Sequence, residues 1–163
     1  MLNIKSAVKM LPLLLLLSFN SFAQQPAQTV PGFTFFTYEK HSFTDKNLAA
    51  GKTLFFVFFD AECEHCKHAI KEINQHYSQL KKVAVYLVSL DGKEKMNSFL
   101  DKYGPGLKNK KNITLLLDSK NEFILKFKPQ KYPSLFLYSS KKQLIMYDDN
   151  EENLSKFWQK IKN

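Results

Sequence analysis

The most informative stretch of the sequence is Thr53-Leu-Phe-Phe-Val-Phe-Phe-Asp-Ala-Glu-Cys-Glu-His-Cys-Lys67. Its apolar run, residues 54–59, is too short to span a membrane and has the composition of a strand buried on both faces. Cys63 and Cys66 follow shortly afterwards and are the only two cysteines in the chain. The residues after them have helical spacing. Two cysteines separated by two residues, where a buried strand leads into a helix, indicate a redox-active dithiol.

Residues 1–23 have the three parts of a signal peptide. Two lysines precede an apolar stretch, residues 10–17, and residues 21–23 (Ser-Phe-Ala) form the small-x-small pattern that signal peptidase recognises. The apolar stretch is shorter than the roughly 20 residues of a transmembrane helix. We therefore expect cleavage after Ala23, export to the periplasm or cell envelope of a bacterium, and no stable membrane span after cleavage. An uncleaved signal anchor is the alternative.

The remaining chain has the length of one domain. Residues 24–30 are polar and contain proline, so we expect a flexible lead-in before a single domain at residues 31–163. The chain is 44% hydrophobic and carries 15 Phe and 7 Tyr, which is enough to fill one core.

The charge of the chain is strongly positive, at +9, and every basic residue is a lysine. Nucleic-acid recognition relies on arginine for bidentate base contacts and stacking, so we expect no nucleic-acid partner. The lysines are scattered along the sequence, which is typical of a solvated surface. A preference for acidic partners or anionic membrane surfaces is the alternative.

Predicted strands alternate with predicted helices along the chain. The periodicity predicts strands at 31–36, 53–59, 83–89, 112–117, 134–138 and 143–147. It predicts helices at 63–80, 93–103 and 121–127 and after 150, with a turn or short helix at 43–50. This alternation indicates an α/β fold with a partly parallel sheet. Active chemistry in such sheets lies at the carboxyl ends of the strands, and Cys63 lies just past such an end.

Cys63 and Cys66 meet the chemical requirements of disulfide exchange. A helix N-terminus offers unpaired backbone N–H groups and the positive end of the helix dipole, which favour a thiolate at Cys63. Cys66, one turn later, is placed to resolve a mixed disulfide.

The residues around the two cysteines act on this thiolate in opposite directions. His65, if protonated, stabilises it, whereas the negative charges of Asp60, Glu62 and Glu64 oppose it.

Two structural roles compete with the redox interpretation. A purely structural disulfide between such close cysteines closes a very small loop and stabilises little. A zinc site would need His65 and His68 to converge with both thiols from one helical turn. His41 and His76 are isolated in the sequence and are interpreted as ordinary surface or cap residues. We therefore expect no metal and no cofactor.

Residues 31–161 resemble the thioredoxin-like proteins, in particular the exported TlpA/ResA-like thiol-disulfide oxidoreductases of bacterial envelopes. The similar segments are Pro31-Gly-Phe-Thr-Phe35, Leu48-Ala-Ala-Gly-Lys52 and the apolar strand that enters Cys-x-x-Cys-Lys. The resemblance implies a thioredoxin-like fold, with a central mixed β-sheet flanked by helices on both faces. It also implies catalytic cysteines that form a redox disulfide, with protein thiols or disulfides and an envelope redox partner as the molecules they act on.

Tyr132-Pro133, followed by Ser134-Leu-Phe136, resembles the cis-proline loop of this family. That loop packs beside the two cysteines and binds the substrate chain. The cis form of an X-Pro bond costs only about 0.5–1 kcal/mol, so a packed site can hold it. A trans proline that merely begins a strand is the alternative.

The chain departs from the family pattern close to the cysteines. Glu62 replaces the usual tryptophan, Glu64-His65 replaces the usual Gly-Pro, and Val57 replaces a buried acid. Because oxidising members such as DsbA and protein disulfide isomerase also carry histidine before the second cysteine, the direction of electron flow is open. We hypothesise that Asp60 substitutes for the missing acid as a proton acceptor.

The predicted function is therefore an exported thiol-disulfide oxidoreductase. One alternative is a thioredoxin-like binding module that carries a metal or docks a partner without turnover. Another is a peroxiredoxin-type peroxidase, whose site resembles Thr-x-x-Cys with an arginine on the thiolate. Position 60 is Asp here, and the chain contains no arginine.

Overall fold

The computed structural model describes residues 25–162, so the predicted signal peptide lies outside the described residues. The strands are β1 (Thr34–Phe36), β2 (Ser42–Thr44), β3 (Leu54–Phe58), β4 (Ala84–Ser89), β5 (Ile113–Leu117), β6 (Ser134–Tyr138) and β7 (Leu144–Asp148). The helices are α1 (Glu64–Gln75), α2 (Tyr77–Leu80), α3 (Lys93–Tyr103), α4 (Glu122–Phe127) and α5 (Leu154–Lys162). Three 3-10 turns complete the order: η1 (Asp45–Asn47), η2 (Pro105–Leu107) and η3 (Glu151–Asn153).

The strands form one seven-stranded mixed sheet in the order β2-β1-β5-β4-β3-β6-β7. The central strands β3, β4 and β5 are parallel, whereas β6 pairs antiparallel with β3, β7 with β6, and β1 with both β5 and β2. Every residue of β3 and β4 is buried, as expected for strands covered on both faces. This arrangement confirms the predicted α/β fold with a mixed sheet.

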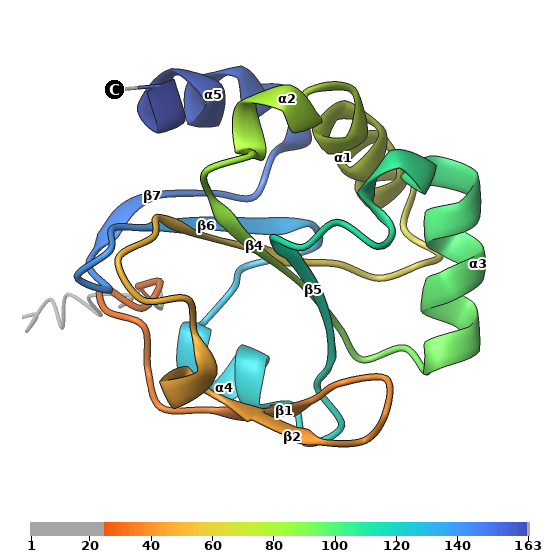
Figure 1. Ribbon diagram of the computed structural model, residues 1–163, viewed down its shortest axis with the longest axis horizontal. Helices are drawn as coiled ribbons and strands as arrows, with labels where there is room; N and C mark the ends of the chain where they lie inside the picture. The colour runs from red at the N-terminus through yellow and green to blue at the C-terminus, as the bar shows by residue number, and fades with distance from the viewer. Residues whose placement is uncertain (1–24, 163) are drawn as a thin grey trace, which may run out of the picture.

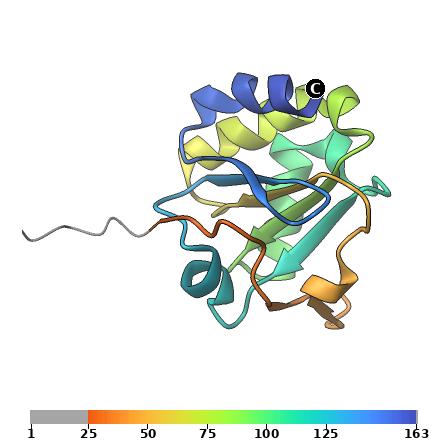
Figure 2. The same ribbon diagram turned by 90° about the vertical axis from the view of Figure 1, so that its left-hand side faces the viewer.

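Helices cover both faces of this sheet (Figures 1 and 2). On one face, α1, α3 and α5 bury their apolar stripes against a core that also includes Cys66. On the other face, α4 packs on a core made largely of aromatic rings, among them Phe35, Phe56 and Phe123. The predicted covering of both faces is therefore confirmed, and one of the two cysteines is part of a hydrophobic core.

Two details of the predicted secondary structure are wrong. The helix predicted to run through Leu80 breaks at His76, which ends α1 and precedes α2. The segment predicted as a turn or short helix includes the end of a strand, β2, and only then η1, which Thr44 caps. The helix predicted at 121–127 is present as α4, with Phe123 and Phe127 buried and Ile124 40% exposed.

The segment expected to be a lead-in forms backbone hydrogen bonds with the rest of the domain. Ala27 N–H donates to the carbonyl of Phe127 at 2.9 Å, and Thr29 forms an isolated antiparallel bridge with Gln143. Leu144 N–H donates to the carbonyl of Gln28 at 2.8 Å. These backbone bonds attach the segment to the β6–β7 hairpin and to the end of α4. Within residues 25–162, no helix combines the length and apolar character needed to cross a bilayer.

Candidate redox site

Cys63 lies between the carboxyl end of β3 and the first turn of α1. It is the N-cap residue of α1, in extended backbone conformation, and its Sγ accepts the N–H of Cys66 at 3.4 Å. A cap normally satisfies one of the free N–H groups of the first helical turn, and here a sulfur does so. The predicted position of Cys63 at a helix N-terminus is thus confirmed.

The two thiols differ sharply in their surroundings. Cys63 is half-buried, whereas Cys66 is fully buried on the core side of α1 beside Ala69 and Ile70. Burial raises the pKa of the Cys66 thiol, because the charged thiolate loses its solvation. Both cysteines are in the free thiol form. Of the pair, Cys63 is therefore the thiol that an incoming molecule reaches first.

The loop before β6 faces Cys63. The Tyr132-Pro133 peptide is cis, as the resemblance implies, and the Tyr132 carbonyl lies 3.8 Å from Cys63 Sγ. The Tyr132 ring packs on Phe58 with centroids 4.8 Å apart, and burial raises the pKa of its hydroxyl to about 12. The structure thus brings Tyr132 and Pro133 to the cysteines from more than half the domain away in sequence.

Asp60 and Glu62 shape the turn that leads from β3 into α1. The Asp60 carboxylate accepts the N–H of Glu62 at 2.7 Å, and its carbonyl accepts the N–H of Cys63 at 3.3 Å. Burial is the main cause that raises the pKa of Cys66; a hydrogen bond with the Asp60 backbone lowers this pKa, whereas Cys63 and, last, the charge of Asp60 raise it further. Asp60 is therefore close enough to Cys66 to influence its ionisation.

A lysine-centred network lies on the side of this turn that faces α3. Lys95 Nζ contacts Glu62 Oε1 and Asp91 Oδ1, each at 2.8 Å. Asp91 Oδ2 accepts the N–H of Ala61 at 2.9 Å and the hydroxyl of Ser89 at 3.1 Å. Burial alone would raise the pKa of Asp91, but Lys95 and these hydrogen bonds outweigh it and lower the pKa. We call Asp91, Lys95 and Glu62 the α3 flank.

A single ion pair lies on the opposite side. His65 Nδ1 is 2.7 Å from Glu151 Oε1, which joins the first turn of α1 to η3. Burial would raise the pKa of Glu151, but the hydrogen bond from His65 lowers it. Glu64 pairs instead with Lys67, one turn further along α1. We call His65 and Glu151 the η3 flank.

The sequence did not reveal Asp91, Lys95 or Glu151 as neighbours of the cysteines. One signal could have found Asp91: it follows β4, whose carboxyl end meets that of β3 at the same sheet edge. Nothing comparable in the sequence points to Glu151.

Within the described part of the chain, no cluster of three or more His, Cys, Asp or Glu side chains has the geometry to hold a metal ion. His68 is exposed on α1, and His41 is exposed before β2. His76, at the end of α1, stacks on Trp158 with centroids 5.4 Å apart.

The fold and the site together define a class of protein. A mixed sheet in this order, a Cys-x-x-Cys pair at the start of α1 and a cis-proline loop beside it characterise a thioredoxin-like oxidoreductase. The chain belongs to the AhpC/TSA family, whose profile matches residues 26–147. No curated protein sequence matches the chain significantly.

Solved structures support the same fold. A thioredoxin-like protein from Porphyromonas gingivalis has a TM-score of 0.65 and 20% identity, covering 85% of this chain and 92% of that one. A secreted Mycobacterium tuberculosis disulfide oxidoreductase homologous to E. coli DsbE has a TM-score of 0.63 and 20% identity, covering 78% and 95%. A protein assigned as the thiol:disulfide interchange protein DsbE from Chlorobium tepidum has a TM-score of 0.67 and 16% identity, covering 85% and 99%.

Proposed function

We propose that this protein is an exported thiol-disulfide oxidoreductase that exchanges disulfides with protein partners through Cys63 and Cys66. The observation that carries the proposal is the position of Cys63 Sγ, which caps α1 and lies 3.8 Å from the Tyr132 carbonyl. A half-buried thiol is thus presented beside backbone that can pair with an extended peptide. Cys66 is buried beneath it and serves as the resolving thiol.

The exchange proceeds in two balanced steps when the dithiol reduces a partner. The Cys63 thiolate attacks one sulfur of the partner disulfide, forming a mixed disulfide and releasing the other partner sulfur as a thiolate. Cys66 then gives up its proton and attacks Cys63 Sγ, which releases the second partner sulfur as a thiolate. The partner gains two electrons, and Cys63 and Cys66 are left as a disulfide. Oxidation of a dithiol partner is the reverse sequence.

The resolving step needs a proton acceptor, because burial keeps Cys66 in its neutral thiol form. We assign this role to Asp60, whose carboxylate lies in the turn directly before Cys63. Its charge opposes a thiolate at Cys66 while it is ionised, and that opposition disappears when Asp60 takes up the proton. Asp60 therefore couples removal of the proton to the attack by Cys66.

Tyr132 and Pro133 are assigned to substrate binding, and Glu62, Glu64, His65 and Asp60 to tuning of the thiolate. The direction of electron flow follows from the reduction potential of the Cys63–Cys66 pair relative to its partner. A value near −270 mV would identify a reductant, and one near −120 mV a strong oxidant.

The decisive experiment compares Cys66→Ala with Cys63→Ser in extracts of cell envelopes. We expect Cys66→Ala to accumulate mixed disulfides with partner proteins, because the second step is blocked, and Cys63→Ser to accumulate none. The wild-type protein should also reduce insulin with dithiothreitol. The proposal fails if Cys66→Ala traps nothing and the wild type does not reduce insulin.

The same preparation separates the other two functions. A peroxiredoxin-type peroxidase would consume hydrogen peroxide faster than simple thiols do, and a metal-carrying module would retain stoichiometric metal after purification in the reduced state. The AhpC/TSA family match makes the peroxidase test worthwhile. Asp60 and the absence of arginine from the sequence argue against that activity.

Export rests on the signal-peptide pattern of residues 1–23. One of the similar solved structures is likewise described as secreted. Cell fractionation tests this part of the proposal independently: we expect a periplasmic or envelope protein that begins after Ala23. A cytoplasmic protein with an intact N-terminus would contradict it without affecting the chemistry.

A further inference from the structure

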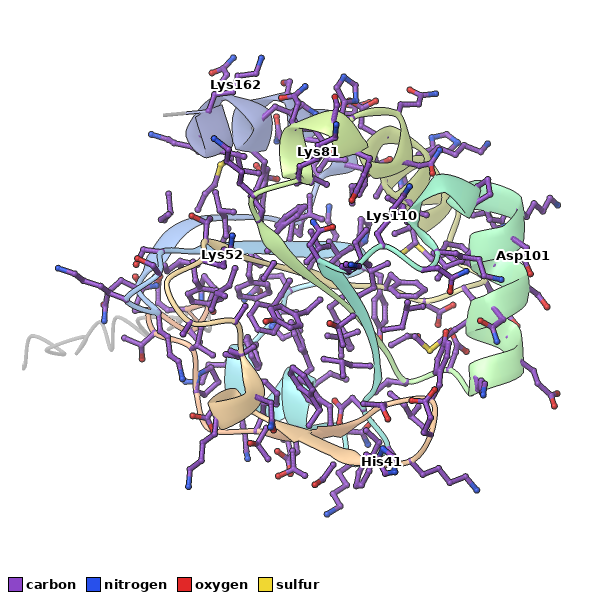
Figure 3. The ribbon with its side chains drawn as sticks, in the orientation of Figure 1. His41, Lys52, Lys81, Asp101, Lys110 and Lys162 are labelled. Atoms are coloured by element: carbon purple, nitrogen blue, oxygen red, sulfur yellow. The ribbon has the colours of Figure 1, made fainter. Side chains whose placement is uncertain are left out.

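A lysine-lined hollow lies at the edge of the sheet opposite the cysteines. Lys52 precedes the amino end of β3, Lys81 and Lys82 precede that of β4, and Lys111 precedes that of β5. These four lysines line one hollow of about 250 Å³. Figure 3 labels Lys52 and Lys81, together with the neighbouring Lys110, around these strand ends. We call this feature the lysine hollow.

The positive charge of the lysine hollow is not balanced locally. No Asp or Glu among residues 25–162 lines it, and none of its four lysines forms an ion pair within that range. Lysines elsewhere behave differently: Lys95, Lys108 and Lys126 each contact a carboxylate within 3 Å. Four unpaired ammonium groups around one small space produce a concentrated positive potential.

The lysine hollow is also lined by a polar side chain in a fixed position, that of Tyr86. Tyr86 is only 3% exposed, and its hydroxyl oxygen accepts the N–H of Ala49 at 2.9 Å. Within the described chain the hydroxyl hydrogen has no acceptor of its own. Burial raises the pKa of Tyr86, so the hydroxyl stays protonated and able to donate. The Tyr86 hydroxyl can therefore donate a hydrogen bond to an anionic oxygen that enters the hollow.

The walls of the lysine hollow are held in place by Asn112. Its side-chain nitrogen donates to the carbonyl of Leu80 at 2.8 Å and to that of Val83 at 2.9 Å. Its side-chain oxygen accepts the hydroxyl of Tyr77 at 2.8 Å. These bonds tie the turn carrying Lys81 and Lys82 to the loop carrying Lys111. Lys81 and Lys82 from one loop and Lys111 from another are thus held close together before any ligand binds.

From these observations we propose that the lysine hollow binds a phosphate-bearing group, with Lys52, Lys82 and the Tyr86 hydroxyl as principal contacts. Lysine is a point-charge phosphate ligand, and a group with several anionic oxygens can engage more than one ammonium at once. At about 250 Å³ the hollow lies below the roughly 300–1,000 Å³ of drug-sized pockets, which suits a small anion. The group comes either from a soluble phosphate compound or from a phospholipid headgroup. The site is separate from the cysteines and is independent of the redox proposal.

The test is a calorimetric titration of the purified protein with inorganic pyrophosphate at low ionic strength. We expect saturable binding with a dissociation constant below about 1 mM. The variant K52Q/K82Q should bind about tenfold more weakly, because two contacts are lost. The control K102Q/K156Q removes the same charge from α3 and α5, outside the lysine hollow, and should stay within about twofold of wild type.

The variant Tyr86→Phe tests the Tyr86 hydroxyl as a contact without changing the net charge. We expect it to weaken pyrophosphate binding about threefold, because one donor is lost, while circular dichroism confirms the fold. Unchanged binding in this variant would overturn the assignment of Tyr86 as a contact. Equal weakening in the two double-lysine variants, or no saturable binding, would overturn the lysine hollow as a site.

A second experiment distinguishes a phospholipid headgroup from a soluble compound as the source of the phosphate. The protein is mixed with vesicles of phosphatidylglycerol and phosphatidylcholine, and with vesicles of phosphatidylcholine alone. A phospholipid headgroup would be identified by three results together. The wild-type protein sediments with the anionic vesicles, K52Q/K82Q does not, and pyrophosphate prevents the sedimentation of the wild type. Binding of pyrophosphate without sedimentation would identify a soluble compound. Either result supports the proposed chemistry.

Discussion

The two flanks of the dithiol are held in different ways. On the α3 flank, Lys95 joins two carboxylates, and Asp91 is bonded in turn to backbone and to a buried serine. On the η3 flank a single ion pair joins His65 to Glu151, and the His65 side chain is 71% exposed. The α3 flank therefore rests on several linked bonds, whereas the η3 flank rests on one pair. The comparison indicates that the α3 flank holds the turn in place more firmly than the η3 flank does.

Loss of Asp91 should have the largest effect of the changes that separate the two flanks. Asp91→Ala leaves the Ala61 N–H and the buried Ser89 hydroxyl without their acceptor, so we expect a loss of about 1–3 kcal/mol in the free energy of unfolding. Urea unfolding measures this directly. The matched control is Asp101→Ala, whose pair with Lys108 is exposed and should contribute less than about 1 kcal/mol. Equal losses in both variants would show that the α3 flank does not anchor the turn.

Removal of the lysine at the centre of the α3 flank should have an intermediate effect, on reactivity rather than stability. Lys95→Gln leaves the charges of Glu62 and Asp91 uncompensated beside the turn, and negative charge disfavours a thiolate. We expect alkylation of Cys63 by iodoacetamide near pH 7 to slow by about two- to fivefold. Lys102→Gln, on the same helix, serves as the control. A rate unchanged or increased by Lys95→Gln would contradict the role given to this flank.

Disruption of the η3 flank should have the smallest effect, and that effect should depend on pH. The folded structure lowers the pKa of Glu151, so its contribution to stability is present above its ordinary value of 4.5 and is lost as the pH falls through the folded value. Because the His65 side chain is largely exposed to solvent, Glu151→Gln should cost only about 0.2–1 kcal/mol at neutral pH.

The difference between wild type and Glu151→Gln should shrink between neutral pH and about pH 3, because the Glu151 carboxylate is progressively protonated as the pH falls through its lowered pKa. Urea unfolding at the two pH values measures it. Glu152→Gln removes a neighbouring charge without touching the pair and provides the control. A constant difference at both pH values would mean that packing, and not the ion pair, carries the contribution of Glu151.

Most of the fold could be predicted because its signals are local. The apolar spacing of α3 predicted its bounds at Lys93 and Tyr103, and the run from Thr53 to Phe59 predicted β3 within one residue at each end. The break at His76 could not be predicted in this way. No glycine or proline marks it, and the ring contact that His76 makes there is with Trp158, a residue far along the chain on α5.

The residues of the candidate site likewise divide into those with a local sequence signal and those without one. Cys63, Cys66, Tyr132 and Pro133 could be recognised because each belongs to a short motif with its own chemistry. The bonds that complete the site join residues separated by 30 positions (Ala61 to Asp91) and by 86 positions (His65 to Glu151). Neither spacing leaves a periodic trace in the sequence, so only the assembled sheet reveals these neighbours.

The segment attached to β7 has a consequence for the behaviour of the protein at high concentration. β7 is the last strand of the sheet, and an open edge strand is a template for pairing with another chain. The bridge between Thr29 and Gln143, with the bond from Leu144 N–H to Gln28, occupies the beginning of that edge. Residues 25–30 therefore protect this edge against edge-to-edge aggregation. A protein shortened to begin at Pro31 would lose that protection and keep both of its cysteines.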